Sequence, residues 1–367
     1  MLRGKVAVAM SGGVDSSVSA LLLRNAGHEV RGIFMRTWNA EESKSPIGEC
    51  PWRNDLNDAQ RVCEQLGIAF EVVNMIANYR DLVVKDLVEG YRMGRTPNPD
   101  ILCNARIKFG ILKKYAHDSG FEKFATGHYC RILENANGTL DLLSGADVNK
   151  DQSYFLAMLS QHQLKNTIFP VGILKKSEVR KLAESAGLVN CKKKDSQGIC
   201  FLGNVKIQDF LSGYVEDVPG DIVDVNGRTM GRHRGLFRFT IGQRRGMGVP
   251  SNVDFAHYVV VGKDLERNQL LVEMESEDSK FLWGSEFFLG DLNFINEPLP
   301  DVAHIAAIPR YRDPPQRAKF FRTGEKTARI VFEKPQRALA SGQIIAIASS
   351  LSGNYSGKRI FGGGILL

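Results

Sequence analysis

Residues 6–17 read VAVAMSGGVDSS, an apolar run followed at once by serines, glycines and an aspartate. The run VAVAM (6–10) is typical of a buried parallel strand, and Val18, Leu21 and Leu22 then recur with the spacing of one helix face. A glycine-rich turn between a strand and a helix can hold phosphate, because its backbone N–H groups and the helix N-terminus attract anions. The turn lacks the lysine of a Walker loop, and no GxGxxG spacing is present. It therefore predicts phosphate binding of another kind.

The aspartate of this turn has two compatible interpretations. A carboxylate beside phosphate needs a cation between them, which makes Asp15 a candidate contact for Mg²⁺. Asp15 or Ser16 can also serve simply as the cap of the following helix.

Strands and helices alternate through the rest of the first two hundred residues. Strands are expected at 29–35, 68–75 and within 121–129, and helices over 78–93 and 104–119. This alternation predicts a doubly wound α/β domain with a parallel sheet, whose ligands bind at the carboxyl ends of the strands.

The composition changes in the second half of the chain. A glycine-rich stretch precedes a final part with period-two alternation, which predicts a small β-barrel. Residues 301–367 carry 11 Lys and Arg against 4 Asp and Glu, which accounts for the whole net charge of +7. A basic excess at one end favours nucleic acid as partner. We expect an α/β catalytic domain at 1–202, a small central domain at 203–276 and a basic barrel at 277–367.

Six cysteines in 367 residues, none in a CxxC pair, argue against a disulfide scaffold and against a zinc site. No apolar run is long enough for a transmembrane helix. We expect a cytoplasmic protein without membrane contact. Four of the cysteines have no special context and are assigned to structure: Cys50, Cys63, Cys130 and Cys191.

The other two cysteines are candidate reactive thiols. In GRTPNPDILCNARIKFG (94–110) a helix is expected near Asp100, which places Cys103 in its first turn, where the helix dipole favours thiolate. Asp100 could then act as general acid or base. The alternative is a capping Asp100 and a small buried Cys103. In KKKDSQGICFLG (192–203), Cys200 follows three lysines and a glycine turn, although it could equally be a core cysteine.

These motifs resemble those of known enzymes. SGGVDSS resembles the PP-motif of the ATP-pyrophosphatase superfamily, whose members cleave ATP to AMP and pyrophosphate and activate a carbonyl oxygen by adenylation. Over nearly its whole length the chain resembles the tRNA-uridine 2-sulfurtransferases (tRNA 2-thiouridylases), with the matching blocks AMSGGVDSSV, GIFMRTW, GRTPNPDILCN, ATGHY, KDQSYFL, FPVG, KKKDSQGICF, PGDIV, TIGQRRGMGV, RYRD and GGGI.

The resemblance implies a reaction. ATP, with Mg²⁺, would adenylate the C2 carbonyl oxygen of the wobble uridine in tRNAs of the Glu, Gln and Lys type. Cys200 would carry a persulfide received from a sulfur-relay protein or cysteine desulfurase. Cys103 would attack that persulfide, freeing sulfide or forming a Cys103–Cys200 disulfide, and Asp100 would serve as acid or base.

The resemblance also implies binding residues. Those for ATP would be Ala9, Met10, Ser11, Gly12, Gly13, Val14, Asp15, Ser16, Ser17, Met35 and Gly127. Those for tRNA would be Asn98, Pro99, Asp100, His128, Lys150, Asp151, Gln152, Arg310, Tyr311 and Gln343. The alternatives are a satisfied loop residue for His128 and a surface residue of a barrel turn for Gln343. Five arginines in 231–245 suit tRNA phosphates, or form a charged linker.

Two other interpretations remain. A ligase or amidotransferase of the same superfamily would share the first turn but needs neither cysteine pair nor basic barrel. A tRNA-binding protein with a degenerate turn would release no pyrophosphate. The chain departs from the 2-thiouridylase pattern at 39–57 and before residue 258, which leaves the contacts of the central domain in doubt. A monomer is expected.

Overall fold

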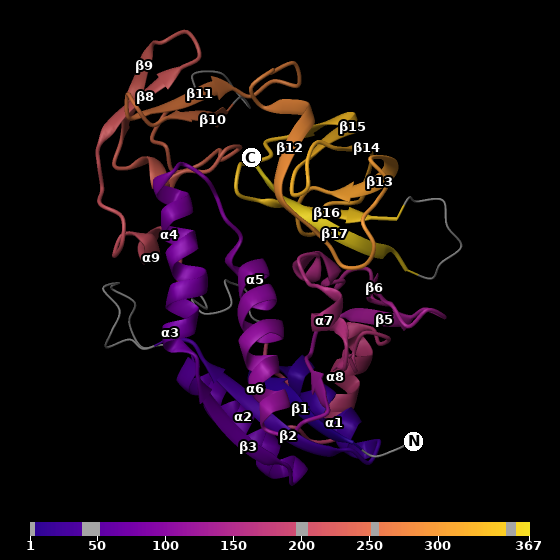
Figure 1. The fold of residues 1–367 in the computed structure, drawn as a ribbon. Coiled ribbons are helices and arrows are strands. Elements are labelled where there is room, and N and C mark those ends of the chain that lie inside the picture. Colours follow the sequence, from indigo (N-terminus) through magenta and orange to yellow (C-terminus); the bar gives the residue numbers. More distant parts are fainter. Residues whose placement is uncertain (1–3, 39–51, 196–204, 251–256, 350–356) are drawn as a thin grey trace.

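The computed structural model of the chain describes residues 4–38, 52–195, 205–250, 257–349 and 357–367 (Figure 1). In the first domain five parallel strands form a sheet in the order β3-β2-β1-β4-β7. They are β1 Lys5–Met10, β2 Glu29–Arg36, β3 Ala69–Asn74, β4 Lys123–Ala125 and β7 Thr167–Ile168. The predicted parallel sheet is confirmed. No strand is predicted at β7, because two residues are too few to show a pattern.

Helices cover both faces of this sheet. On one face lie α1 Val14–Asn25, α2 Trp52–Leu66 and α8 Lys176–Ser185. They pack on Val6 and Val8, whereas Ala7 faces the helices on the other side. Successive residues of a strand point to opposite faces, so β1 contributes to both cores, and these three residues are fully buried. The first domain is therefore doubly wound, as predicted.

Two long helices cover the second face, and each contains a π-helical stretch. The first comprises α3 Ile76–Tyr79, η2 Arg80–Val84 and α4 Lys85–Arg92; the second comprises α5 Pro99–Leu102, η3 Cys103–Leu112 and α6 Lys113–Asp118. The second helix starts before Asp100, because the side-chain oxygen of Asn98 caps it by accepting the N–H groups of Asp100 (3.1 Å) and Ile101 (3.3 Å). The predicted helix start near Asp100 is thus met to within one residue, and Cys103 is the fifth helical residue, just past the first turn. The dipole effect weakens beyond that turn, so it favours the Cys103 thiolate less than expected.

A hairpin links the first domain to the last. It consists of β5 Cys130–Glu134 and β6 Leu140–Ser144, and it is followed by η4 Ser153–Leu156 and α7 Gln161–Leu164. β6 pairs with the last strand of the chain, with Leu142 opposite Ile360. The hydroxyl of Tyr154 donates to the carbonyl oxygen of Ile344 at 2.8 Å, so the contact continues beyond the hairpin.

The central domain is a small four-stranded sheet in the order β10-β11-β8-β9. Its elements are β8 Gly220–Asp224, β9 Thr229–His233, η5 Leu236–Arg238, β10 Tyr258–Asp264 and β11 Gln269–Met274, and α9 Ile207–Leu211 precedes them. Its own small core contains Ile222, Phe239 and Val260.

The C-terminal domain is a closed barrel of six strands, as predicted. The strands follow the order β12-β15-β14-β13-β16-β17, and a pairing between β12 and β17 closes the circle. They are β12 Trp283–Phe294, β13 Val302–Ile308, β14 Gln316–Arg322, β15 Ala328–Arg337, β16 Ile344–Ala348 and β17 Arg359–Leu366. The exact domain boundaries stay predictions. Within the described ranges, none of the helices combines the length and apolar character needed to cross a bilayer.

Candidate active site

The turn between β1 and α1 is tied together by its own serines. The Ser16 hydroxyl accepts the N–H of Ser11 (3.2 Å) and donates to the carbonyl of Gly13 (3.0 Å). The Ser17 hydroxyl donates to the same carbonyl at 2.9 Å. Gly13 caps α1, so the first N–H groups of the helix have no helical carbonyl to bond. The predicted phosphate turn is thus a rigid element with backbone donors at its helical end.

Residues from other parts of the first domain hold this turn in place. Gly12 has φ +72°, and a Cβ there would lie 2.2 Å from a carbonyl oxygen of α2. A Cβ at Gly127, which follows β4, would lie 2.7 Å from the amide nitrogen of Ser16. The buried side chain of Asn190 donates to the carbonyl of Gly12 (3.0 Å) and to the hydroxyl of Ser17 (2.9 Å). Gly127, one of the predicted ATP residues, therefore lies directly against the start of α1.

The carboxylate of Asp15 accepts two hydrogen bonds. Its Oδ1 atom accepts the hydroxyl of Tyr129 at 2.7 Å and the ammonium of Lys176 at 2.7 Å. Burial and then the charge of Asp15 raise the pKa of Tyr129, so this phenol stays protonated and donates. Lys176 begins α8, and its side chain is only 12% exposed. A lysine distant in sequence thus reaches the turn that lacks one of its own.

Asp195 extends this network. It pairs with Lys176 (2.7 Å), Arg180 (3.0 Å) and Lys150. Burial would raise the pKa of Asp195, but the hydrogen bonds from Lys150 and Lys176 outweigh it and lower the pKa to about 2. Asp195 is therefore ionised throughout the physiological range. Lys150, Lys176 and Arg180 thus gather beside the turn, and such cations are the usual partners of phosphate oxygens.

The turn fits ATP together with Mg²⁺ through its donors and one carboxylate. Among the described residues no three His, Cys, Asp or Glu side chains gather as a metal site. Magnesium at nucleotide sites typically needs only one or two carboxylates, because water and substrate phosphates supply the other ligands. Asp15 fits that role once Lys176 turns from it to a phosphate.

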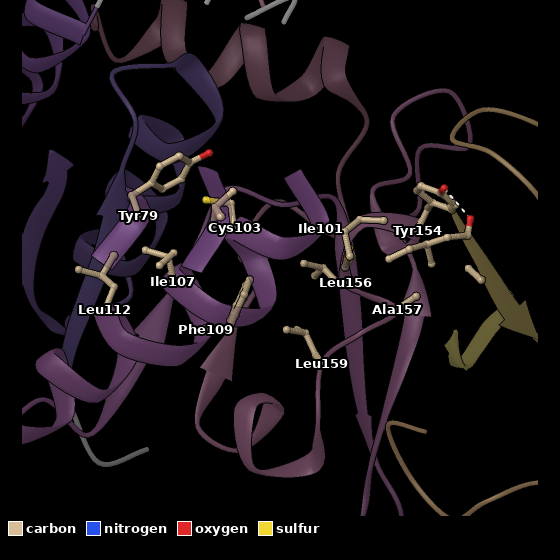
Figure 2. Close-up of a cluster of buried hydrophobic side chains, with 14 of the residues drawn as sticks. Tyr79, Ile101, Cys103, Ile107, Phe109, Leu112, Tyr154, Leu156, Ala157 and Leu159 are labelled. Atoms are coloured by element: carbon tan, nitrogen blue, oxygen red, sulfur yellow. Dashed lines mark hydrogen bonds between the residues drawn. The ribbon is translucent and has the colours of Figure 1, made fainter. Parts of the chain in front are cut away.

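In the second predicted centre, at α5, the cysteine lies in the hydrophobic core. Asp100 is half-buried, and Cys103 is 0% exposed. Figure 2 shows Cys103 within the cluster of buried side chains that includes Tyr79, Ile107 and Phe109. A persulfide or a nucleotide can reach this sulfur only after a movement of the surrounding side chains. The structure thus leaves both interpretations of Cys103 in place, the reactive thiol and the small core residue.

Cys200 and Cys50 lie outside the described residues. Before Cys200, the ammonium of Lys193 pairs with Asp55 (2.7 Å) and Asp58 (2.5 Å) of α2. This lysine therefore ties the segment before Cys200 to α2. Burial raises the pKa of Cys63 to about 12 and also raises that of Cys130, which fits the structural roles predicted for both.

The predicted tRNA residues of the first domain also have partners within the protein. Asp151 accepts the N–H groups of Gly145 and Ser153, both at 3.1 Å, and Gln152 accepts the N–H of Tyr129 at 3.1 Å. Lys150 pairs with Asp195 as described above. Lys150 is thus linked to Asp15 of the β1–α1 turn through Asp195 and Lys176, and Gln152 is linked to it through Tyr129. Their contact with tRNA stays a prediction.

His128 is half-buried between aromatic rings. Its Nδ1 lies 2.7 Å from the hydroxyl of Thr126, and its ring centroid lies 5.7 Å from that of Phe109. Burial, and then the charge of Lys108, lower the pKa of His128, so the ring is neutral at pH 7. A neutral ring can contact tRNA as a hydrogen-bond partner or stacking surface rather than as a cation.

The predicted tRNA residues of the barrel lie where it meets the first domain. Tyr311 packs on Phe155 with ring centroids 4.3 Å apart, and Arg310 pairs with Asp313 at 3.2 Å. Gln343 donates to the carbonyl of Thr96, just before α5. In the Arg-rich stretch of the central domain, Arg238 forms a two-point pair with Asp217 (2.7 and 2.8 Å), and Arg244 pairs with Glu275 (2.6 Å). At least two of its five arginines thus have structural partners.

Three family models match the chain in order. They describe a tRNA methyl transferase HUP domain (residues 4–204), a tRNA methyl transferase PRC-barrel domain (208–274) and an aminomethyltransferase beta-barrel domain (285–366). A tRNA-specific 2-thiouridylase MnmA of Akkermansia muciniphila is 46% identical over 98% of both chains. The chain belongs to the tRNA-specific 2-thiouridylase family. Proteins of the same name from Streptococcus mutans and Streptococcus agalactiae are each 42% identical over 99% of this chain and 95% of their own.

Three residues of this 2-thiouridylase-family site were not predicted. Asn190, Lys176 and Asp195 come from the region after β7, the strand too short to recognise. Lys176 opens a helix after a parallel strand, and the carboxyl ends of parallel strands share one edge with the phosphate turn. For Lys176, this position after a parallel strand is the sequence feature that indicates a place in the site. Nothing in the sequence distinguishes Asn190 from other polar residues.

Proposed function

We propose that this protein is an ATP-dependent tRNA 2-thiouridylase that replaces the C2 oxygen of a wobble uridine with sulfur. Its membership of that family supports the substrate. The observation that carries the chemistry is Lys176, held 2.7 Å from Asp15 at a turn built for phosphate. An enzyme that expels pyrophosphate needs positive charge where negative charge develops, and Lys176 supplies it.

In the first step the C2 oxygen of the uracil attacks the α-phosphorus of ATP, and pyrophosphate leaves. The proposed cradle comprises the first N–H groups of α1 with Lys176, while Met35 and Gly127 border the adenosine. Lys176 exchanges its hydrogen bond to Asp15 for one to a phosphate oxygen. Asp195 keeps hold of the same ammonium, since its low pKa leaves it ionised. Asp15, released from Lys176, would hold Mg²⁺.

In the second step sulfur displaces AMP. The terminal sulfur of a Cys200 persulfide attacks C2 of the adenylated uracil, and AMP leaves with the former C2 oxygen. The thiolate of Cys103 then attacks the inner sulfur, which forms a Cys103–Cys200 disulfide and releases 2-thiouridine. Alternatively, Cys103 first frees sulfide, which attacks C2. An external thiol reduces the disulfide in both cases, and Asp100 moves the proton at the base.

The partners follow from these steps. The substrate is tRNA of the Glu, Gln or Lys type, contacted by Asn98, Pro99 and the barrel residues Arg310, Tyr311 and Gln343. The persulfide sulfur comes from a sulfur-relay protein or a cysteine desulfurase. We propose a monomer acting in the cytoplasm.

Reconstitution tests the proposal. The protein is incubated with ATP, a persulfide donor and unmodified tRNA, and nucleosides are analysed by mass spectrometry alongside pyrophosphate release. We expect 2-thiouridine in tRNA with uridine at the wobble position, and none in the same tRNA with cytidine there. Cys103→Ser and Cys200→Ser should each abolish 2-thiouridine, whereas Cys63→Ser, a buried control, should not. Full thiolation by either of the first two variants would overturn the sulfur chemistry.

A further inference from the structure

The segment 94–98, here called the lead segment, joins α4 to α5 and sets where α5 begins. Asn98 at its end caps α5, and Asp100 follows in the first helical turn. In Figure 1 the lead segment joins the upper ends of the two helices, where the other two domains approach the first. Any shift of the lead segment therefore moves Asp100 and Cys103.

The barrel binds both backbone polar groups of one residue in the lead segment, Thr96. The N–H of Thr96 donates to the carbonyl of Ser341 at 2.7 Å, and the carbonyl of Thr96 accepts the side-chain amide of Gln343. Between these two, Gly342 has φ +90°, and a Cβ there would lie 3.0 Å from the backbone nitrogens of Thr96 and Pro97. The barrel turn 341–343 thus fits against the lead segment as closely as a glycine allows.

The central domain and α4 hold the same segment from other sides. Lys263 of β10 donates its ammonium to the carbonyl of Gly94 at 3.3 Å. The N–H of Arg95 donates to the carbonyl of Gly90 in α4 at 2.8 Å, and a Cβ at Gly90 would lie 2.2 Å from the ring of Pro97. All three domains therefore fix the five residues that precede the predicted acid/base residue and thiol.

We propose that the barrel turn 341–343 and Lys263 are positioning elements for the reaction: they set the start of α5, and so the placement of Asp100 and Cys103, across domain boundaries. This inference rests on the proposed function. It assigns the barrel a task besides binding RNA, namely to complete the acceptor site of the first domain. Misplacement of reacting groups by about 1 Å can cost about a hundredfold in rate.

Gly342→Ala tests this in the full-length enzyme, because the added methyl group pushes on Thr96 and Pro97. Gly227→Ala is the matched control, since Gly227 has a similar φ of +84° and an added Cβ there would meet nothing within 4 Å. We expect kcat for thiolation to fall about tenfold to a hundredfold in Gly342→Ala, with the affinity for ATP unchanged and a change in KM for tRNA smaller than that in kcat. Alkylation of Cys103 in the variant, followed by peptide mass spectrometry, should become faster as its packing loosens.

Two outcomes would overturn the inference: a kcat equal to that of Gly227→Ala, or a raised KM for tRNA with unchanged kcat. If Gly342→Ala does not fold, Lys263→Met acts on the same segment from the other domain and should lower kcat, with recovery in Lys263→Arg. An unchanged kcat in Lys263→Met would then contradict the inference. If the wild-type protein forms no 2-thiouridine, the proposed function fails instead. The reactions of the wild type and of Gly227→Ala therefore distinguish the two failures.

Discussion

The β1–α1 turn and the start of α5 are built in opposite ways. The turn is held within its own domain, by its serines, Asn190 and the Lys176–Asp15 pair. The start of α5 is held by its own Asn98 cap and by α4, and in addition from outside, by Ser341 of the barrel and by Lys263 of the central domain. Under the proposed function, the first domain alone would organise ATP activation, whereas the acceptor site would need all three domains.

Removing the lysine of the turn should give the largest effect. In Lys176→Ala, pyrophosphate release should fall about a hundredfold to a thousandfold, the usual cost of losing one preorganised donor to developing charge. Thiolation should fall equally, and the alkylation rate of Cys103 should not change, because α5 is held independently. Quenched-flow assays of pyrophosphate and 2-thiouridine measure both.

The adjacent exposed lysine provides the control for this variant. Lys175→Ala keeps the net charge of Lys176→Ala but leaves Asp15 and Asp195 paired. It should retain activity near that of the wild type. Equal losses of activity in the two variants would mean that only the net positive charge of this region matters. They would exclude a specific role for Lys176 in the reaction.

Loss of Asn190 should give an intermediate effect. Asn190→Ala leaves the buried carbonyl of Gly12 and hydroxyl of Ser17 without this donor, at a cost of about 1–3 kcal/mol in the free energy of unfolding. The affinity for ATP should fall with it, because the turn loosens. Urea unfolding and ATP titration measure the two, with the exposed Asn226→Ala as control. A stable variant with weakened tRNA binding but normal ATP binding would break the distinction between the two regions.

The smallest effect concerns pH. The pKa of Asp195 is about 2 against 3.8 for an ordinary aspartate, so its ion pairs stabilise the folded state above about pH 4 and lose that effect as the pH falls through 2. Asp195→Asn should therefore lower the free energy of unfolding by about 1–2 kcal/mol at pH 7, and by less at pH 3. Urea unfolding at both pH values tests this, with the exposed pair variant Asp118→Asn as control. A loss that grows toward low pH would contradict the assignment.

The sequence predicts the contiguous parts of this site better than the assembled ones. The strand, turn and first helix follow from 6–17 because glycine, serine and apolar spacing act locally. The barrel follows from period-two alternation. The roles of Asn190 and Lys176 cannot be predicted from the sequence, since they depend on a two-residue strand and on packing between distant helices. The start of α5, one residue before Asp100, has a local cause: Asn98, rather than Asp100, takes the capping role.

Oxygen-18 placed at C2 of the wobble uridine tests the central claim most directly. If the protein adenylates this oxygen and sulfur then displaces AMP, one labelled oxygen should appear in the phosphate of AMP for each 2-thiouridine formed. Mass spectrometry of AMP and of the nucleosides from one reaction measures both. Unlabelled AMP accompanied by labelled water, or thiolation without release of AMP, would contradict the account.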